Sequence, residues 1–196
     1  MPAKYDSDIH AFLFLFEGDE TPPAVVVDRL RPSIDRDAGP VFFAATFEGD
    51  FQGFAHIAER DTKALADLID GRLWDAGVRS HHATEGKYHV NQQGQAMGPT
   101  RNSPRFLAIA RVYVNQRPTE VMGNIADSFG DRLDAYGQSL SAFIGSSTVI
   151  GSFHLLVELG DDDRQALDQH VESLRGVAGV GRIEVAVTDT GPGQAA

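Results

Sequence analysis

Hydrophobic and polar positions along the chain predict two successive sets of strands and helices. Residues 9–16 have the length and aromatic content of a strand, and both faces of this run are apolar. Further short apolar runs predict strands, and apolar positions at helical spacing predict helices between them. In the first set the strands are 9–16, 41–47, 51–59 and 78–84, and the helices are 24–34 and 62–76. The predicted order is therefore strand, helix, strand, strand, helix, strand.

The same order begins again after a polar segment that is rich in Gly, Gln, Asn and Pro, a composition typical of a linker. The second set has strands 106–114, 133–144, 149–159 and 180–188 and helices 118–129 and 163–174. We therefore expect a first repeat at 1–86, a linker at 87–104, a second repeat at 105–190 and a disordered tail at 191–196.

The two sets also resemble each other in sequence. At an offset of 102, residues 49–79 align without a gap on 151–181, and eight of these 31 positions are identical. About two identities would be expected by chance from ordinary residue frequencies. The matches fall on a hairpin glycine, an inward aromatic, a helix cap, the helix stripe and the turn into the last strand. The pattern predicts an internal duplication, with the first strands aligned at a shorter offset, near 94.

Each predicted copy is a βαββαβ unit, the ferredoxin-like motif, in which two helices cover one face of a four-stranded sheet. Because the first strand is apolar on both faces, we expect the other face of the sheet to be buried as well. The sheet of the second copy, or of another subunit, would cover it. The predicted fold is therefore α+β, with tandem ferredoxin-like repeats in a dimeric α/β-barrel-type arrangement.

Three short motifs recur in both copies. They are Gly-x-Phe-x before a strand (Gly49 to Gln52, Gly151 to His154), Asp-x-x-Ala-Leu (Asp61 to Leu65, Asp163 to Leu167) and Gly-Val at the last strand (Gly77-Val78, Gly179-Val180). This pattern resembles the effector-binding domain of the Lrp/AsnC family, a ferredoxin-like module that associates into α/β barrels. Members typically carry an acidic residue where this chain has Gln52 and His154, which weakens any transfer of ligand specificity.

The resemblance implies a stand-alone module rather than a DNA-binding regulator, because only eight residues precede the first predicted strand and leave no room for a helix-turn-helix. Our first hypothesis is thus a non-enzymatic module that binds a small molecule and assembles as a homo-oligomer. The alternative is a small enzyme of the dimeric α/β-barrel group, of the monooxygenase, isomerase or haem-dependent type, with a His/Tyr/Arg pocket.

Composition restricts the possible partners. The 17 basic and 28 acidic residues give a net charge of −11, which argues against nucleic-acid binding and against attachment to an anionic membrane. The chain has no cysteine, so disulfides, thiol nucleophiles and cysteine-based metal sites are excluded. No secretory signal or membrane span is visible, and we expect a cytoplasmic protein.

The charge is locally reversed between residues 86 and 119, which include no acidic residue. This stretch carries five basic residues, Lys87, Arg101, Arg105, Arg111 and Arg117. It could steer an anionic ligand to the mouth of a barrel, or it could lie on the acidic surface of a neighbouring subunit.

Polar residues within the predicted strands are the candidates for chemistry. Alternation places Arg111 and Tyr113 on one face of the strand 106–114, and His154 and Glu158 on the corresponding face of 149–159. Together they could bind an anionic or carboxylate ligand, and His154 could serve as a general base. The structural alternative is that Arg111 pairs with Glu158 while His154 forms a hydrogen bond at a subunit contact.

The remaining histidines give weaker signals. His56 lies in the equivalent strand of the first copy and is a second candidate for a ligand pocket. His81 and His82 are adjacent in a predicted strand, so their side chains point to opposite faces, and His89 adds no metal-ligand spacing. We therefore expect no metal site, and the sequence specifies no cofactor.

Overall fold

The computed structural model describes residues 9–30, 41–59, 62–78, 82–83, 85–89, 104–133, 139–146 and 153–190. Its contacts divide the chain into two units, residues 1–87 and 88–196, which are described separately. Most of the expected linker 87–104 and the whole of the expected tail 191–196 lie outside the described residues, as does His81. No helix within the described ranges is long and apolar enough to cross a membrane.

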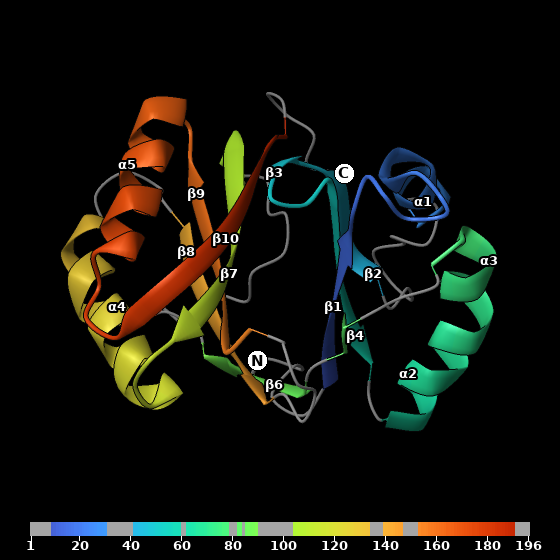
Figure 1. Cartoon of the computed structure of the whole chain (residues 1–196), viewed down its shortest axis with the longest axis horizontal. Coiled ribbons are helices and arrows are strands. Elements are labelled where there is room, and N and C mark those ends of the chain that lie inside the picture. The colour runs from blue at the N-terminus through green and yellow to red at the C-terminus, as the bar shows by residue number, and fades with distance from the viewer. Residues whose placement is uncertain are drawn as a thin grey trace, which may run out of the picture. The chain divides into compact units, whose positions relative to one another are not determined.

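The first unit is a four-stranded antiparallel sheet with its helices on one face (Figure 1). Its strands lie in the order β2-β4-β1-β5, and the pairs β1–β4, β1–β5 and β2–β4 are antiparallel. The strands are β1 (Ile9–Leu15), β2 (Val41–Thr46), β4 (Gly53–Glu59) and β5 (His82–Ala83), with a two-residue β3 (Glu48–Gly49) between β2 and β4. The helices are α1 (Pro23–Leu30) and a continuous segment made of α2 (Thr62–Leu68), the π-helical turn η2 (Ile69–Leu73) and α3 (Trp74–Ala76).

Local sequence explains where α1 forms and how it packs. Pro23 occupies the first helical position, where its missing N–H costs nothing, and Val26, Val27 and Leu30 recur at helical spacing. These three side chains are buried against Leu13 and other residues of the first core. The amphipathic helix therefore covers the face of β1 that carries Leu13.

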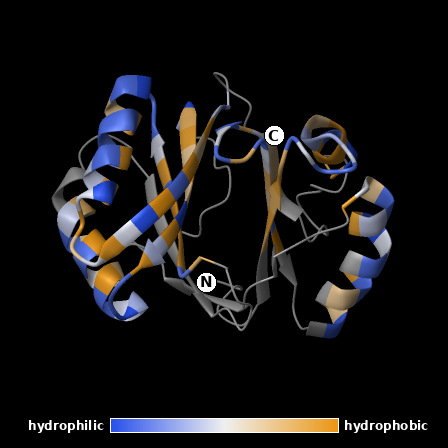
Figure 2. Cartoon of the chain, viewed as in Figure 1, coloured by the Kyte–Doolittle hydropathy of each residue, from blue (hydrophilic) through white to orange (hydrophobic). Residues whose placement is uncertain are grey.

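The second unit repeats this architecture. Its strands lie in the order β10-β7-β9-β8, and each adjacent pair is antiparallel. Its helices α4 and α5 cover one face (Figure 1), and β10 alternates between hydrophobic and hydrophilic residues (Figure 2). The strands are β7 (Phe106–Val114), β8 (Ser139–Ser146), β9 (Leu155–Asp161) and β10 (Val180–Asp189), the helices are α4 (Pro118–Leu133) and α5 (Arg164–Arg175), and β6 (Glu85–His89) spans the boundary between the units.

In both units the first strand of the repeat lies between the third and the fourth, with the second outermost, which is the ferredoxin-like strand order. The predicted α+β class with antiparallel sheets is therefore confirmed. Gly53 pairs with Leu15 in the first unit and Leu155 with Val112 in the second, so β4 corresponds to β9 at the predicted offset of 102. The first strands correspond at 97 (Leu15 to Val112), whereas the sequence predicted an offset near 94. The common origin of the two units and the pairing of their sheets in a barrel remain predictions.

Several element ends differ from the prediction, among them three in the second unit. Helix α4 continues to Leu133, although we expected it to end before Gly130. A glycine inside a helix costs only about 1 kcal/mol, which the packing of Val121, Ile125 and Phe129 in the core outweighs. Because α4 includes residue 133, β8 begins later than predicted, at Ser139 rather than at 133. Strand β9 also begins later, at Leu155 rather than at 149.

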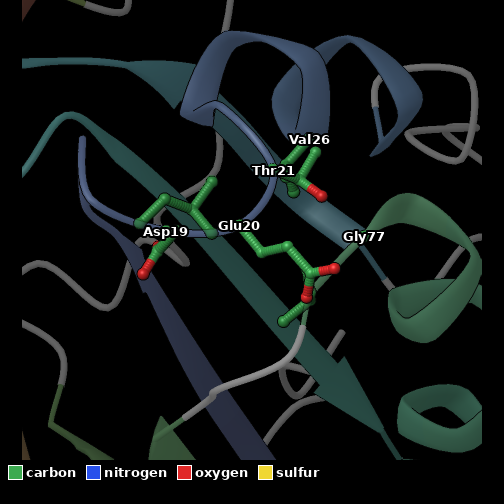
Figure 3. Close-up of a pocket in the computed structure, with 7 residues that line it drawn as sticks. Asp19, Glu20, Thr21, Val26 and Gly77 are labelled. Atoms are coloured by element: carbon green, nitrogen blue, oxygen red, sulfur yellow. The ribbon is translucent and has the colours of Figure 1, made fainter.

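One glycine precedes the last strand of each repeat, and the two glycines occupy equivalent positions. Gly77 and Gly179 adopt φ values of +98° and +88°, in the left-handed region that favours glycine. A Cβ at Gly77 would lie 2.4 Å from Oγ1 of Thr21, and one at Gly179 would lie 2.6 Å from Cγ2 of Val121. Figure 3 shows Gly77 and Thr21 among the residues that line a hollow in the first unit. A side chain at either position would therefore strain the backbone and displace a neighbouring side chain.

We expect Gly77→Ala and Gly179→Ala each to destabilise the protein by at least about 1–2 kcal/mol, because an alanine must adopt a positive φ and displace its neighbour. Gly123→Ala is the matched control, since Gly123 lies in α4 with no atom near its would-be Cβ, and it should stabilise by about 0.5–1 kcal/mol. The urea midpoint of each variant provides the measurement. Equal midpoints for Gly77→Ala and Gly123→Ala would contradict the expectation.

Candidate functional site

The polar candidates of the second unit lie on the face of its sheet opposite α4 and α5, here called the helix-free face. On β7, Ala108, Ala110 and Val112 belong to the core beneath the helices, so Arg111 and Tyr113 point to the other side. The same alternation places Glu158 of β9 on the helix-free face. The sequence therefore predicted the correct face for these residues.

Strand register orders this face into three rows, two residues apart along each strand, or roughly 6.6 Å. Side chains become more buried from the first row to the third. The outer row is Arg182, Tyr113 and His154; the middle row is Glu184, Arg111 and Leu156; the inner row is Ala186, Ile109 and Glu158.

Glu184 is the centre of a charged cluster that joins the outer and middle rows. Its Oε2 accepts hydrogen bonds from Arg111 Nη2 and from the Tyr113 hydroxyl, the latter at 3.1 Å. Its Oε1 lies 3.2 Å from Nη2 of Arg182, whose guanidinium stacks 4.0 Å from the centre of the Tyr113 ring. One carboxylate thus holds two guanidinium groups and a phenol.

The inner part of this cluster is withdrawn from solvent. The side chains of Arg111 and Glu184 are only 12% and 20% exposed, whereas that of Arg182 is 62% exposed. Burial raises the pKa of Tyr113, so its hydroxyl remains a proton donor at neutral pH. The alternative expectation of an ion pair between Arg111 and Glu158 is wrong. The carboxylate that pairs with Arg111 is that of Glu184, which lies directly opposite on the neighbouring β10.

Glu158 in the inner row is buried, with 7% of its surface exposed. Removal of the carboxylate from water raises its pKa from the ordinary value of 4.5 to about 7. A carboxyl group with this pKa exchanges its proton near neutral pH, as a general acid or base must. Glu158 and Arg111 are diagonal neighbours on adjacent strands, which places their Cβ atoms about 7–8 Å apart.

His154, in the outer row, forms two hydrogen bonds with the backbone at the end of β7. Its backbone N–H donates to the Val112 carbonyl at 2.9 Å, and its side-chain Nδ1 accepts from the Val114 N–H at 3.1 Å. In the neutral ring the remaining proton is therefore on Nε2. The lone pair that a general base requires is already used, so the general-base hypothesis for His154 does not fit this geometry. His154 can instead donate a hydrogen bond through Nε2–H.

The first unit has the same arrangement of hydrogen bonds at the equivalent position. Gln52 corresponds to His154 at the offset of 102; its N–H donates to the Leu15 carbonyl, and its Oε1 accepts from the Glu17 N–H, both at 2.9 Å. In both units a side chain thus satisfies a backbone N–H beyond the end of the sheet ladder. Because the same two hydrogen bonds recur in both units, the residue after the buried phenylalanine has a structural role. Any ligand-binding role of His154 is additional to this one.

The helix-free face of the first unit has a different character. His56 of β4 is buried there, with its ring 4.9 Å from that of Phe12. It occupies the position equivalent to Glu158, and its role in ligand binding remains a prediction. The other side chains that the structure describes on this face include a network of aromatic contacts among Phe12, Phe14, Phe43, Phe47, Phe51 and Phe54. Among the described side chains, more titratable groups lie on the helix-free face of the second unit than on that of the first.

Arg182 and Glu184 were missed by the sequence reasoning, although a signal was present. In β10 they alternate with Ile183 and Val185, which pack in the core. In the ferredoxin-like order the last strand lies beside the first, so polar positions in β10 must adjoin Arg111 and Tyr113.

Three of the five basic residues of the acid-free stretch have acidic partners within the second unit. Arg105 pairs with Asp189 at 3.2 Å, Arg111 with Glu184, and Arg117 with Glu120 at 3.9 Å. Arg101 lies outside the described residues. In the part of the chain that the structure describes, no group of three His, Asp or Glu side chains is placed to hold a metal ion.

Comparisons with known proteins agree on the architecture. An anthrone oxidase-like protein matches with a TM-score of 0.57 and 15% identity over 100% of this chain and 98% of its own. The siroheme decarboxylase NirDL matches with a TM-score of 0.62 and 10% identity over 94% of this chain and 73% of its own. A heme-binding protein from Thermus thermophilus matches with a TM-score of 0.53 and 10% identity over 91% and 89%. The chain has the fold of these proteins.

No family model and no curated protein sequence matches the chain, so the resemblance to the Lrp/AsnC effector domain stands at the level of the ferredoxin-like fold. Our first hypothesis of a non-enzymatic binding or assembly module is corrected by these comparisons. The similar structures are those of an oxidase-like protein, a decarboxylase and a heme-binding protein, and they favour the enzymatic alternative.

Proposed function

We propose that the chain is an enzyme of the oxidase or monooxygenase type that removes a proton from an enolisable polycyclic substrate on the helix-free face of the second unit. Glu158 is the base, and the outer and middle rows hold the substrate. The observation that carries this proposal is the position of Glu158: a buried carboxyl group, three rows deep, beside a cluster of hydrogen-bond donors.

The burial of Glu158 has a chemical use. Its pKa of about 7 leaves a substantial carboxylate fraction at neutral pH, while the carboxylate is more basic than an exposed one. Desolvation also strengthens its interaction with a proton that a bound substrate offers. Support for the class of reaction comes from the similarity of fold to an anthrone oxidase-like protein.

The proposed reaction balances with dioxygen as the only co-reactant. Glu158 takes a proton from the carbon that is conjugated with the substrate carbonyl, and the C–H electron pair remains on the substrate as an enolate. Dioxygen then oxidises the enolate. For an anthrone, the ring CH2 becomes a carbonyl, and the two hydrogens leave with one oxygen atom as water. Glu158 returns its proton to that water.

Haem chemistry is less well supported by the residues. An axial imidazole needs a free nitrogen lone pair, usually with its other nitrogen donating to a partner. Of the imidazoles whose hydrogen bonds the structure defines, His154 uses its Nδ1 lone pair on the Val114 N–H. In His170, Nε2 lies 3.0 Å from Oδ2 of Asp161. The arrangement of His154 does not fit an axial ligand. His170 lies on α5, with its side chain only 12% exposed and its ring against Phe129 of the core, so it cannot serve a haem on the helix-free face. A hemin titration that produces no shifted Soret band is therefore the expected result.

Anthrone is a suitable probe of the proposed reaction. We expect the protein to accelerate deuterium uptake at its CH2 group in anaerobic D2O and oxygen consumption in air, both above the buffer rate. Because the base must be deprotonated, the rate should rise with pH and level off above about 7. Glu158→Gln should lower the rate by about 100-fold or more.

Glu120→Gln is the matched control, because Glu120 is exposed on α4 and should leave the rate unchanged. Deuterium uptake and oxygen consumption at the buffer rate across anthrone and related enolisable polycyclic ketones would overturn the proposal. So would a Glu158→Gln variant that retains the wild-type rate.

A further inference from the structure

We propose that the outer row is an anion-binding subsite, in which Arg182, together with Tyr113 and His154, recognises a carboxylate or phenolate group on a planar polycyclic ligand. This inference rests on the proposed function for the position of the reacting carbon, but the binding itself does not depend on catalysis.

Exposure within the cluster is the first argument. Glu184 pairs with both Arg111 and Arg182. Arg111 is largely buried, whereas Arg182 is mostly exposed. The guanidinium of Arg182 is therefore the positive group that an arriving anionic ligand would meet.

The geometry of Arg182 is the second argument. Its guanidinium stacks on the Tyr113 ring at 4.0 Å, and one of its nitrogens contacts Oε1 of Glu184 at 3.2 Å. Stacking and pairing together restrict the orientation of the side chain, so less conformational entropy is lost when a ligand binds. The planar fork of N–H groups matches the two oxygens of a carboxylate.

His154 adds a neutral donor to the same row. Its ring centre lies 6.4 Å from that of Tyr113, and the Val114 N–H bound to Nδ1 leaves the Nε2–H as a donor. Glu184 is the acid of the neighbouring middle row, and both of its oxygens already accept from Arg111, Tyr113 and Arg182. The outer row therefore presents hydrogen-bond donors to an anion.

The distance between the rows sets the size of the ligand. Four residues of extended strand, or roughly 13 Å, separate the outer and inner rows between Cα atoms. The Arg182 guanidinium contacts Glu184 of the middle row, so a rigid system of two or three fused rings with an anionic substituent bound to Arg182 would extend toward Glu158. A compact aliphatic acid would reach Arg182 only.

Arg105 provides an internal control for this site. Its guanidinium stacks on Phe106 at 4.8 Å and pairs with Asp189 at 3.2 Å, and its side chain is 51% exposed. The local chemistry is thus similar to that of Arg182, but Arg105 lies at the opposite end of β7 from Tyr113, away from the donors of the outer row. Comparable substitutions at the two positions separate anion recognition from the general effect of removing an exposed arginine.

The test is a calorimetric titration with 2-naphthoate and, in parallel, with the neutral 2-naphthamide. We expect the wild type to bind naphthoate at least ten-fold more tightly than the amide, with an affinity that falls as salt is added. Arg182→Met should lose about ten-fold or more in naphthoate affinity with the amide unaffected, Arg182→Lys should lie between, and Arg105→Met should match the wild type.

Equal affinity for naphthoate and naphthamide, no binding of either at millimolar concentration, or an Arg182→Met variant with unchanged naphthoate affinity would overturn the inference. Glu158→Gln distinguishes its failure from that of the proposed function. If this variant and the wild type bind naphthoate equally but neither moves a proton of anthrone, the subsite stands and the proposed reaction fails. If anthrone turnover depends on Glu158 while naphthoate does not bind, the reaction stands and the subsite fails.

Discussion

Glu158→Gln is expected to stabilise the folded protein at pH 8 by on the order of 3 kcal/mol while it removes proton transfer from the proposed substrate. The reason is the cost of holding a charged carboxylate away from water on the helix-free face. Glutamine has nearly the same shape and carries no charge, so it avoids this cost. A change that increases stability and removes activity is the expected signature of a residue buried for its chemistry.

The pH dependence follows from the direction of the pKa shift. Burial raises the pKa of Glu158 in the folded protein to about 7, above the ordinary value of 4.5 that the unfolded chain retains. Between these values the folded state binds more protons than the unfolded state, so this group makes the free energy of unfolding fall as pH rises. The stability that Glu158 contributes in its protonated form is fully present below pH 4.5 and is lost as the pH rises through about 7.

Urea unfolding of the wild type and of Glu158→Gln at pH 5 and at pH 8 measures this effect. The difference between the two proteins should be larger at pH 8 than at pH 5. Glu120→Gln, which changes an exposed carboxylate, should show no such difference. A Glu158→Gln variant that is no more stable than the wild type at pH 8 would show that the carboxylate is adequately solvated, and the role of Glu158 as a base of raised pKa would be lost.

Much of the fold was predictable because its signals are local. The apolar run of β1, the stripe of α1 and the Gly-Val turn before β10 each specify an element without reference to distant residues. The βαββαβ succession of these elements then indicated the ferredoxin-like strand order, which the sheets show. The error in the offset of the first strands arose because that segment carries too few identities to fix a register.

The candidate site was predictable only in part. Alternation along single strands placed Arg111, Tyr113 and Glu158 on one face, because the period of a strand is two. The identity of the partner of Arg111 depends on which strand lies beside β7 and in which register, and these are properties of the sheet rather than of a segment. The pKa of Glu158 depends on burial, which no local pattern reveals.

The ion pair between Arg111 and Glu184 yields the second large expected effect. Glu184→Leu should destabilise the protein by about 3 kcal/mol, because it leaves the largely buried guanidinium of Arg111 without this carboxylate and removes the acceptor of Tyr113. Arg111→Leu should cost less, since Glu184 retains Arg182 and Tyr113 as partners. Urea unfolding of each variant provides the measurement.

The double variant Arg111→Leu/Glu184→Leu should be more stable than Glu184→Leu alone, because an apolar pair of similar volume replaces a buried ion pair at little net cost. The first unit supplies the precedent, since Phe14 is buried at the position equivalent to Arg111, at the offset of 97. The fold thus accepts an apolar residue at this position of the repeat. Additive losses in the double variant, with no recovery relative to Glu184→Leu, would contradict this and make the pair a structural requirement of the second unit.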